Sequence, residues 1–378
     1  MEVVGRLILD DGVAHGRIRI RDRTIVDVSL DSGPADLPPG ASDAGPLIAP
    51  GFVDLHVHGW GGYDAMGGAE PLDGMARALF RRGVTSFLPT AVTAGLSDLA
   101  RFAEGVRAWM PRAPADGASP LGFNLEGPFI SPDRPGAQNR AFIRAPTEVG
   151  WDELGPLVDG LRVTTIAPEV AGAIGLIERL AAAGVAVSLG HSAASRDESL
   201  AGFAAGARST THLFNAMTGV DHHAPGLAAV ALAEDAAWVE LIADGQHVDP
   251  ILWSTILRSK PAGRVLLVSD AISLAGTGDG VGQLGGLDVE VHGDRCTLRG
   301  TEVLAGSVIA LDTAVRNLVR RGVPLPRSVA AGSRVPLDLV GVTDRGRIGP
   351  GLRADLVELD GELAVRRVTH GDGWLDVP

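Results

Sequence analysis

A repeated alternation of short apolar runs with helix-period segments constrains the fold of this chain more than any other feature. Eight apolar runs of strand length follow one another, at residues 52–57, 85–89, 122–125, 163–167, 185–189, 209–212, 239–243 and 265–269. Segments with helical periodicity lie between them, at residues 72–82, 98–109, 174–183, 195–205 and 250–259. This alternation predicts an α/β fold that closes as a TIM-like (β/α)8 barrel. An open doubly wound sheet is the alternative, which is disfavoured because no G-x-G-x-x-G segment follows the first apolar run.

The two ends of the chain carry a different pattern. Five β-like runs separated by turn residues lie there, at residues 2–9, 15–20, 24–29, 354–359 and 363–368. We therefore expect residues 1–49 together with 345–378 to form a small β-sandwich domain, with a Gly/Pro-rich linker at 31–46. The barrel is expected to occupy residues 50–344, with a β-hairpin insertion near 285–304.

Composition and charge exclude several kinds of partner. The formal net charge of −13, without a Lys/Arg run to reverse it locally, disfavours nucleic acid. No apolar run approaches the roughly 20 residues that span a bilayer, so no membrane segment is expected. The only cysteine, Cys296, cannot form an intramolecular disulfide, and the N-terminus lacks a basic and then apolar leader; both features favour a cytoplasmic protein. The only lysine, Lys260, stands before Pro261 and away from any candidate site, which disfavours Schiff-base and carbamylated-lysine chemistry.

Ionisable side chains gather where the predicted strands end. Five of the ten histidines follow or end such a strand, and two carboxylates share that position; the set is His56, His58, Glu126, His191, His212, His247 and Asp270. Barrel enzymes build their sites at the carboxyl ends of the strands. We therefore expect these side chains to converge, although few of them are close in sequence.

The residue types in this set suit a divalent metal. His56 and His58 are two apart on a strand, which points both imidazoles to the same side. Taken alone, such a pair is more often a surface or core feature, but its register with Glu126, His191 and His212 favours a metal site. Carboxylate and imidazole ligands fit one or two ions, with Zn²⁺ the first choice and Fe²⁺, Co²⁺ or Mn²⁺ the alternatives.

Asp270 is the candidate proton shuttle, because a carboxylate near a metal can take the proton of an activated water and return it to a leaving amine. A structural aspartate that caps the next segment is the alternative. His247 follows its strand beyond the metal set, so substrate hydrogen bonding is expected of it.

These residues stand in segments that resemble the amidohydrolase superfamily and, within it, the N-acetylglucosamine-6-phosphate deacetylase family. The matching segments cover nearly the whole chain: PGFVDLHVHG (50–59), NLEGPF (124–129), LGHS (189–192), THLFNAM (211–217), ADGQHVD (243–249), VSDA (268–271), LAGS (304–307) and GPGLRADLVELD (349–360). The LEGPF, GHS and THLFNAM set is specific to the deacetylase branch, whereas the H-x-H pair and the last segment occur across the superfamily.

The resemblance implies a role for each site residue and a homodimer. The main metal would be held by Glu126, His191 and His212, with a second site possible at His56 and His58. Asp270 would act as general base and then general acid. Asn215 and the Ala216 backbone would lie near the sugar phosphate, and His247 would contact the sugar. Leu304 and Gly306 would also contact the substrate.

Two departures from the family pattern bear on the substrate. Gln138 stands where the family has a histidine that polarises the acetyl carbonyl, and an amide can donate a hydrogen bond but carries no charge. His223 stands where the family has an arginine that reaches the phosphate of a substrate in the neighbouring subunit. The loss of that guanidinium fork puts the phosphate in question, although His223 could still bind it when protonated.

The expected function is metal-dependent removal of acetate from an N-acetylated amino sugar, with N-acetylglucosamine 6-phosphate as the leading substrate. A non-phosphorylated amino sugar or another N-acyl compound is the alternative that His223 favours. A non-catalytic sugar-binding homologue is a further alternative, which the complete set of ligand-type residues and Asp270 argues against.

Overall fold

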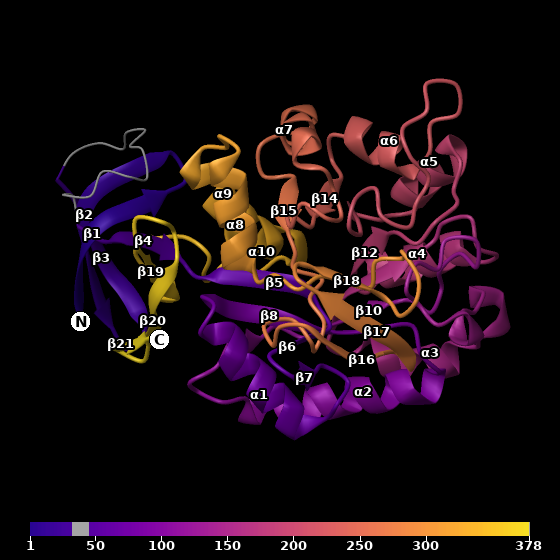
Figure 1. Cartoon of the computed structure of the whole chain (residues 1–378), viewed down its shortest axis with the longest axis horizontal. Helices are drawn as coiled ribbons and strands as arrows, with labels where there is room; N and C mark the ends of the chain where they lie inside the picture. The colour runs from indigo at the N-terminus through magenta and orange to yellow at the C-terminus, as the bar shows by residue number, and fades with distance from the viewer. Residues whose placement is uncertain (32–44, 378) are drawn as a thin grey trace.

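The structure, a computed structural model, describes residues 1–31 and 45–377. Most of the linker expected at 31–46 lies outside the described residues. A sheet built from both chain ends lies beside a larger body of strands and helices, and the two termini lie close together on that sheet (Figure 1).

The larger body is a barrel of parallel strands. Its main path runs β5 (Phe52–Val57), β8 (Val84–Ala91), β10 (Phe123–Glu126), β11 (Leu161–Ile166), β12 (Ala186–Leu189), β13 (Ser209–Thr210), β14 (Trp238–Leu241) and β15 (Val265–Leu267). The two-residue strand β9 (Ser119–Pro120) pairs with β8 off this path. Every residue of β5, β8 and β10 is buried, as expected where helices cover the outer face and side chains fill the inside.

Backbone hydrogen bonds join the first and last strands of this path beyond their regular ends. The Asp270 N–H donates to the His56 carbonyl at 2.9 Å, and the His58 N–H donates to the Ala271 carbonyl at 2.8 Å. The sheet is therefore nearly closed, and the predicted (β/α)8 barrel is confirmed.

Ten α-helices are present in the described part of the chain: α1 (Ala69–Phe80), α2 (Leu96–Trp109), α3 (Trp151–Val158), α4 (Ala173–Ala182), α5 (Arg196–Ala204), α6 (Leu227–Ala233), α7 (Pro250–Ser259), α8 (Leu311–Arg320), α9 (Leu325–Ala331) and α10 (Arg334–Val340). The longer ones are amphipathic; α1, for example, buries Leu72, Met75 and Leu79 at helical spacing. Helices α3, α6, α9 and α10 were not expected from the sequence. They have seven or eight residues each, and three of them contain proline, so their periodic signal is short.

Seven strands from both chain ends form one sheet, in the order β21-β20-β19-β4-β1-β2-β3. Their bounds are β1 (Glu2–Leu9), β2 (Gly12–Arg21), β3 (Thr24–Leu30), β4 (Leu47–Pro50), β19 (Leu356–Leu359), β20 (Val365–His370) and β21 (Gly373–Asp376). The central strand β4 pairs in parallel with β1 and antiparallel with β19. Leu47 and Ala49 of β4 pack in the same hydrophobic cluster as the barrel core. Ile48, between them, packs in a separate cluster with Leu7, Ile18 and Leu356.

The segment after the last barrel strand adds a small sheet near the site. Strands β16 (Gly280–Leu284), β17 (Leu287–His292) and β18 (Arg295–Leu298) form an antiparallel meander, so the insertion begins earlier and has one strand more than the expected hairpin. Short strands β6 (Gly59–Trp60) and β7 (Tyr63–Asp64) form a further pair. Among the described residues, no helix is both long and apolar enough to cross a membrane.

Candidate metal centre and active site

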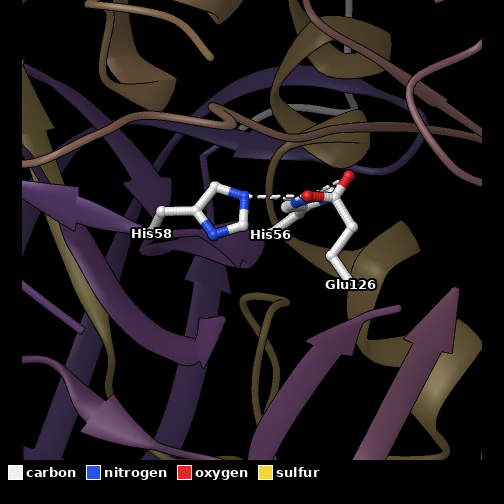
Figure 2. Close-up of side chains that lie close together, drawn as sticks. All are labelled: His56, His58 and Glu126. Atoms are coloured by element: carbon white, nitrogen blue, oxygen red, sulfur yellow. Dashed lines mark hydrogen bonds and ion pairs between the residues drawn. The ribbon is translucent and has the colours of Figure 1, made fainter. Parts of the chain in front are cut away.

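The expected metal-binding side chains meet at the carboxyl ends of the barrel strands. His56 lies on β5 and Glu126 is the last residue of β10, while His191 and His212 each lie two residues beyond the ends of β12 and β13. Two groups of ligand atoms, each within a span of 4.8 Å, could hold a metal ion: His56, His58 and Glu126, and Glu126, His191 and His212. Figure 2 shows the imidazoles of His56 and His58 facing the Glu126 carboxylate, which both groups share.

Glu126 is the centre of this cluster. Its Oε1 lies 2.9 Å from His212 Nε2, 3.0 Å from His191 Nε2 and 3.4 Å from His56 Nε2. Its Oε2 lies 3.2 Å from His58 Nε2. The carboxylate is 2% exposed, so a single buried charge contacts four imidazoles.

The other ring nitrogen of three histidines is already engaged. His58 Nδ1 donates to the Thr90 carbonyl at 3.1 Å, and His191 Nδ1 donates to the Arg134 carbonyl at 3.0 Å. His56 Nδ1 lies 3.2 Å from a carboxylate oxygen of Glu240. Because these partners accept hydrogen bonds, each neutral ring carries its proton on Nδ1 and turns the Nε2 lone pair toward the cluster.

The spacing between these lone pairs fits a shared cation. The Nε2 atoms of His191 and His212 are 3.1 Å apart, and those of His56 and His58 are 3.2 Å apart. Two bare lone pairs cannot hydrogen-bond to each other, whereas two nitrogens bound to one tetrahedral Zn²⁺ lie about 3.3 Å apart. The donor set and its spacing therefore fit a divalent ion.

The electrostatics of the cluster also favour positive charge. Burial by itself lowers the pKa of His58, but the Asp270 and Glu126 carboxylates outweigh burial and raise the pKa to about 9. Burial acts to raise the pKa of Glu126, yet the field of His56 and His191 holds it well below its usual range. The two carboxylates thus stabilise positive charge between them, which a bound cation would supply in place of protons.

Three residues of the cluster adopt left-handed backbone conformations. The φ angles are +47° at His191, +27° at His212 and +50° at Asp270. Side chains other than glycine rarely occupy this region, and strain of this kind concentrates at functional sites. The sharp turn at each strand end aims the side chain back over the barrel mouth.

Asp270 completes the cluster on the side of His56 and His58. Its Oδ1 lies 3.2 Å from His58 Nε2 and 3.5 Å from His56 Nε2. Its carbonyl accepts a hydrogen bond from the Ser307 N–H at 2.8 Å. A Cβ added at Gly306 would lie 2.7 Å from the Asp270 carbonyl oxygen, so this close approach requires glycine.

A cavity of about 660 Å³ opens onto the cluster. Its lining includes seven of the residues that the sequence places at the substrate or the shuttle position: Gln138, Asn215, Ala216, His247, Asp270, Leu304 and Gly306. His223 lies elsewhere, in a separate cavity of about 500 Å³ beside Ser195 and Thr218. The structure therefore does not bring His223 into the site of its own chain.

Gln138 contacts the cluster directly. Its Nε2 donates to Glu126 Oε2, and its Oε1 accepts the Thr93 N–H at 2.7 Å. These two contacts fix the orientation of the amide. Gln138 thus orients the Glu126 carboxylate that both ligand groups share. The sequence alone does not reveal this contact.

Glu240 is a site residue that sequence reasoning missed. It lies on β14, is 1% exposed, and places Oε2 3.2 Å from His56 Nδ1 and 3.0 Å from the His212 N–H. The available signal was a single acidic residue within an apolar strand, in the segment WVELIAD. A buried carboxylate behind a ligating histidine orients the ring and raises its basicity.

Replacing Glu240 by Gln is expected to weaken ion binding about 10- to 100-fold, because the isosteric amide keeps the shape but is a weaker acceptor for His56 Nδ1. Metal content after dialysis against graded chelator, measured by plasma mass spectrometry, checks this. Glu178→Gln, on the exposed face of α4, is the matched control. If the Glu240 variant retains the ion as well as the wild type does, Glu240 does not support the metal centre.

Comparison with known proteins agrees with this site. The model of the amidohydrolase family matches residues 47–372. An N-acetylgalactosamine-6-phosphate deacetylase of Escherichia coli O157:H7 is 37% identical, with 96% of each chain covered. An N-acetylglucosamine-6-phosphate deacetylase of Bos taurus is 34% identical over 96% of this chain and 90% of the relative.

Solved structures of the same group superpose over nearly the whole chain. The N-acetylglucosamine-6-phosphate deacetylase of Thermotoga maritima has a TM-score of 0.89 at 31% identity, covering 99% of this chain and 98% of that one. A variant of the Mycobacterium smegmatis enzyme in complex with N-acetyl-D-glucosamine-6-phosphate has a TM-score of 0.90 at 32% identity, with the same coverage. The chain belongs to the amidohydrolase family and, within it, to the group of the N-acetylhexosamine-6-phosphate deacetylases.

Proposed function

We propose that this protein is a metal-dependent hydrolase that releases acetate from N-acetylglucosamine 6-phosphate and leaves glucosamine 6-phosphate. The observation that carries the proposal is the Glu126-centred cluster with Asp270 beside it, at the floor of a 660 Å³ cavity. Relatives of 31–37% identity that carry the names of deacetylases support it.

The metal centre of the proposed enzyme holds one or two divalent ions, with Zn²⁺ the first choice. Glu126, His191 and His212 would hold the main ion, and His56 with His58 a second one that shares Glu126. When bound, such an ion polarises the acyl carbonyl and acidifies water. Gln138 and Glu240 keep the ligands in place through their hydrogen bonds to Glu126 and His56.

Asp270 carries the proton in the proposed mechanism. Burial acts to raise its pKa, but His56 and His58 outweigh burial and lower it, so the carboxylate is ionised and ready to accept a proton. Its Oδ1 takes one proton from the attacking water as the new C–O bond forms. It then returns that proton to the nitrogen as the C–N bond breaks, which releases acetate and the free amine.

His247 would bind the sugar in this mechanism. Its Nδ1 lies 2.7 Å from Asp244 Oδ2, which leaves Nε2 for a substrate in the cavity. Asn215 and Ala216, on the loop after β13, line the same cavity and are proposed to contact the substrate, as are Leu304 and Gly306.

A second candidate substrate is N-acetylgalactosamine 6-phosphate. The Escherichia coli relative that carries this name is 37% identical over 96% of the chain. The two sugars differ in the configuration of one hydroxyl group, while the amide that is cleaved is the same.

A homodimer in the cytoplasm completes the proposal. The dimer is supported by the family resemblance, in which a neighbouring subunit reaches the phosphate. The proposed location in the cytoplasm is supported by the one cysteine of the chain, Cys296, which is buried and free. We also propose that residues 1–49 with 345–378 and residues 50–344 are its two domains, because the seven-stranded sheet draws on both chain ends.

Acetate release from the two sugar phosphates and from free N-acetylglucosamine, at equal concentrations, tests the proposal. The Zn²⁺-reconstituted protein is expected to hydrolyse one of the phosphorylated sugars at least about tenfold more efficiently than the free sugar. Chelation should abolish the activity and Zn²⁺ should restore it. No acetate from any of the three, with metal bound, would refute the proposed reaction.

A further inference from the structure

Two arginines line the candidate site in addition to the residues already assigned. Arg134 and Arg140 both lie on the loop that follows β10, and both line the 660 Å³ cavity. Both residues are exposed, and among the described residues neither guanidinium has an ion pair or a hydrogen bond. Two unpaired cations therefore face the space above the metal cluster.

The backbone around Arg134 is fixed to the floor of the site. Its carbonyl accepts the His191 Nδ1 hydrogen bond at 3.0 Å. A Cβ added at Gly136 would lie 3.2 Å from a ring carbon of His191 and 3.4 Å from Ala216 Cβ, so this loop packs against the segment that follows β13. Arg134 thus stands beside the residues where the resemblance places the sugar phosphate.

Arg140 is held from a different direction. The preceding Asn139 caps the short helix η2 (Arg140–Phe142) by accepting the Ala141 N–H at 3.1 Å. The Asn139 amide also donates to the Gly285 carbonyl at 3.3 Å, which ties this turn to the meander of β16 to β18. Arg134 and Arg140 are therefore anchored to separate parts of the cavity wall.

Among the described residues, the acidic side chains of the cavity mouth form no ion pair with these two cations. Two further acidic residues line the cavity, Asp133 and Glu302, and Glu302 is paired with Arg295 at 3.0 Å. His223, the expected substitute for the family's arginine, lies in the other cavity, where its ring is 3.9 Å from that of His222. Among the described residues that line this cavity, the guanidinium groups belong to Arg134 and Arg140.

We propose that Arg134 and Arg140 form the binding site for the phosphate monoester of the substrate, supplied by the same subunit that holds the metal cluster. This inference rests on the proposed function. A guanidinium presents paired N–H donors to phosphate oxygens, which an imidazole near neutral pH does not. In the family, an arginine from a neighbouring subunit reaches the phosphate, and this chain has His223 at that position. Arg134 and Arg140 take the place of that arginine.

The test compares kcat/KM for N-acetylglucosamine 6-phosphate and for N-acetylglucosamine. The ratio of the two values is measured in the wild type, in Arg134→Gln, in Arg140→Gln and in the double variant. Arg144→Gln, on the same loop but lining a different cavity, and His223→Ala are the matched comparisons. Because both arginines are exposed, circular dichroism is expected to show folded variants.

We expect the ratio of kcat/KM for the phosphorylated sugar to kcat/KM for the free sugar to fall about tenfold or more in each single arginine variant and further in the double variant. The same ratio should stay at the wild-type value in Arg144→Gln and His223→Ala. Arg140→Lys should recover part of the loss. A general structural role would lower both kcat/KM values together and leave the ratio unchanged, which would overturn the inference.

Three other outcomes also count against it, and the last two separate it from the proposed function. A ratio that falls in His223→Ala but not in the arginine variants would assign the phosphate to His223. Equal hydrolysis of both sugars by the wild type would leave the deacetylase reaction standing and overturn the phosphate site. No hydrolysis of either sugar by the metal-loaded protein would refute the reaction itself and, with it, this site.

Discussion

Glu126→Ala is expected to lose its bound metal and to release acetate at the background rate. The Glu126 carboxylate belongs to both groups of ligand atoms and lies 2.9 Å and 3.0 Å from His212 and His191. Without it, no carboxylate lies between His191 and His212, and the Asp270 carboxylate remains only beside His56 and His58. The loss of rate should equal or exceed the roughly 10⁴-fold upper range for removal of a general base.

Metal content by plasma mass spectrometry and acetate release check this result together. Glu126→Gln keeps the volume of the side chain and removes only its charge, so it should lose metal as well. Glu178→Gln, exposed on α4, is the control for a change of one charge far from the cluster. Full metal occupancy in Glu126→Ala would show that the ion is held by other residues.

Asp270→Asn is expected to keep its metal while kcat falls about 10²- to 10⁴-fold, because the amide cannot carry the proton from water to amine. The backbone conformation of Asp270 suits the comparison of the wild type with Asp270→Asn. Its φ of +50° is left-handed, a conformation that asparagine tolerates better than most residues, so the variant should fold as the parent does. The substitution therefore changes the proton carrier and not the turn that presents it.

Kinetics with the phosphorylated sugar and metal analysis of the same preparation distinguish the roles of Asp270. Its Oδ1 lies 3.2 Å from His58 Nε2, close enough that a ligand role is the competing assignment. Loss of metal in proportion to the loss of rate would make Asp270 a ligand. Asp244→Asn alters the partner of His247, which lines the same cavity, and should raise KM more than it lowers kcat, so this variant provides a contrast.

The fold and the convergence of the candidate ligand side chains could be predicted because their signals are local and repeated. Each parallel strand is an apolar run, and a polar residue directly after such a run lies at the barrel mouth whatever the rest of the chain does. His56, Glu126, His191 and His212 therefore converge as expected, although up to 156 positions separate them.

The features that were missed depend on distances across the barrel. Glu240 is one acidic residue in an apolar strand, and no spacing in the sequence says that it faces His56. Gln138 lines the cavity, as expected of a substrate contact, but no spacing in the sequence says that its amide also bonds to Glu126 and Thr93. His223 lies in a second cavity of its own chain, and its expected contact with a substrate in the neighbouring subunit stays a prediction.

The pairing of β4 with both β1 and β19 sets an order for folding during synthesis. Strand β4 leaves the ribosome before the barrel strands, whereas β19 follows only after the whole barrel sequence has emerged. Until then one edge of β4 has unpaired backbone groups, and such an edge can recruit other chains. A nascent chain can thus assemble its catalytic barrel early, yet it stays exposed to aggregation until the last strands arrive to close the sheet.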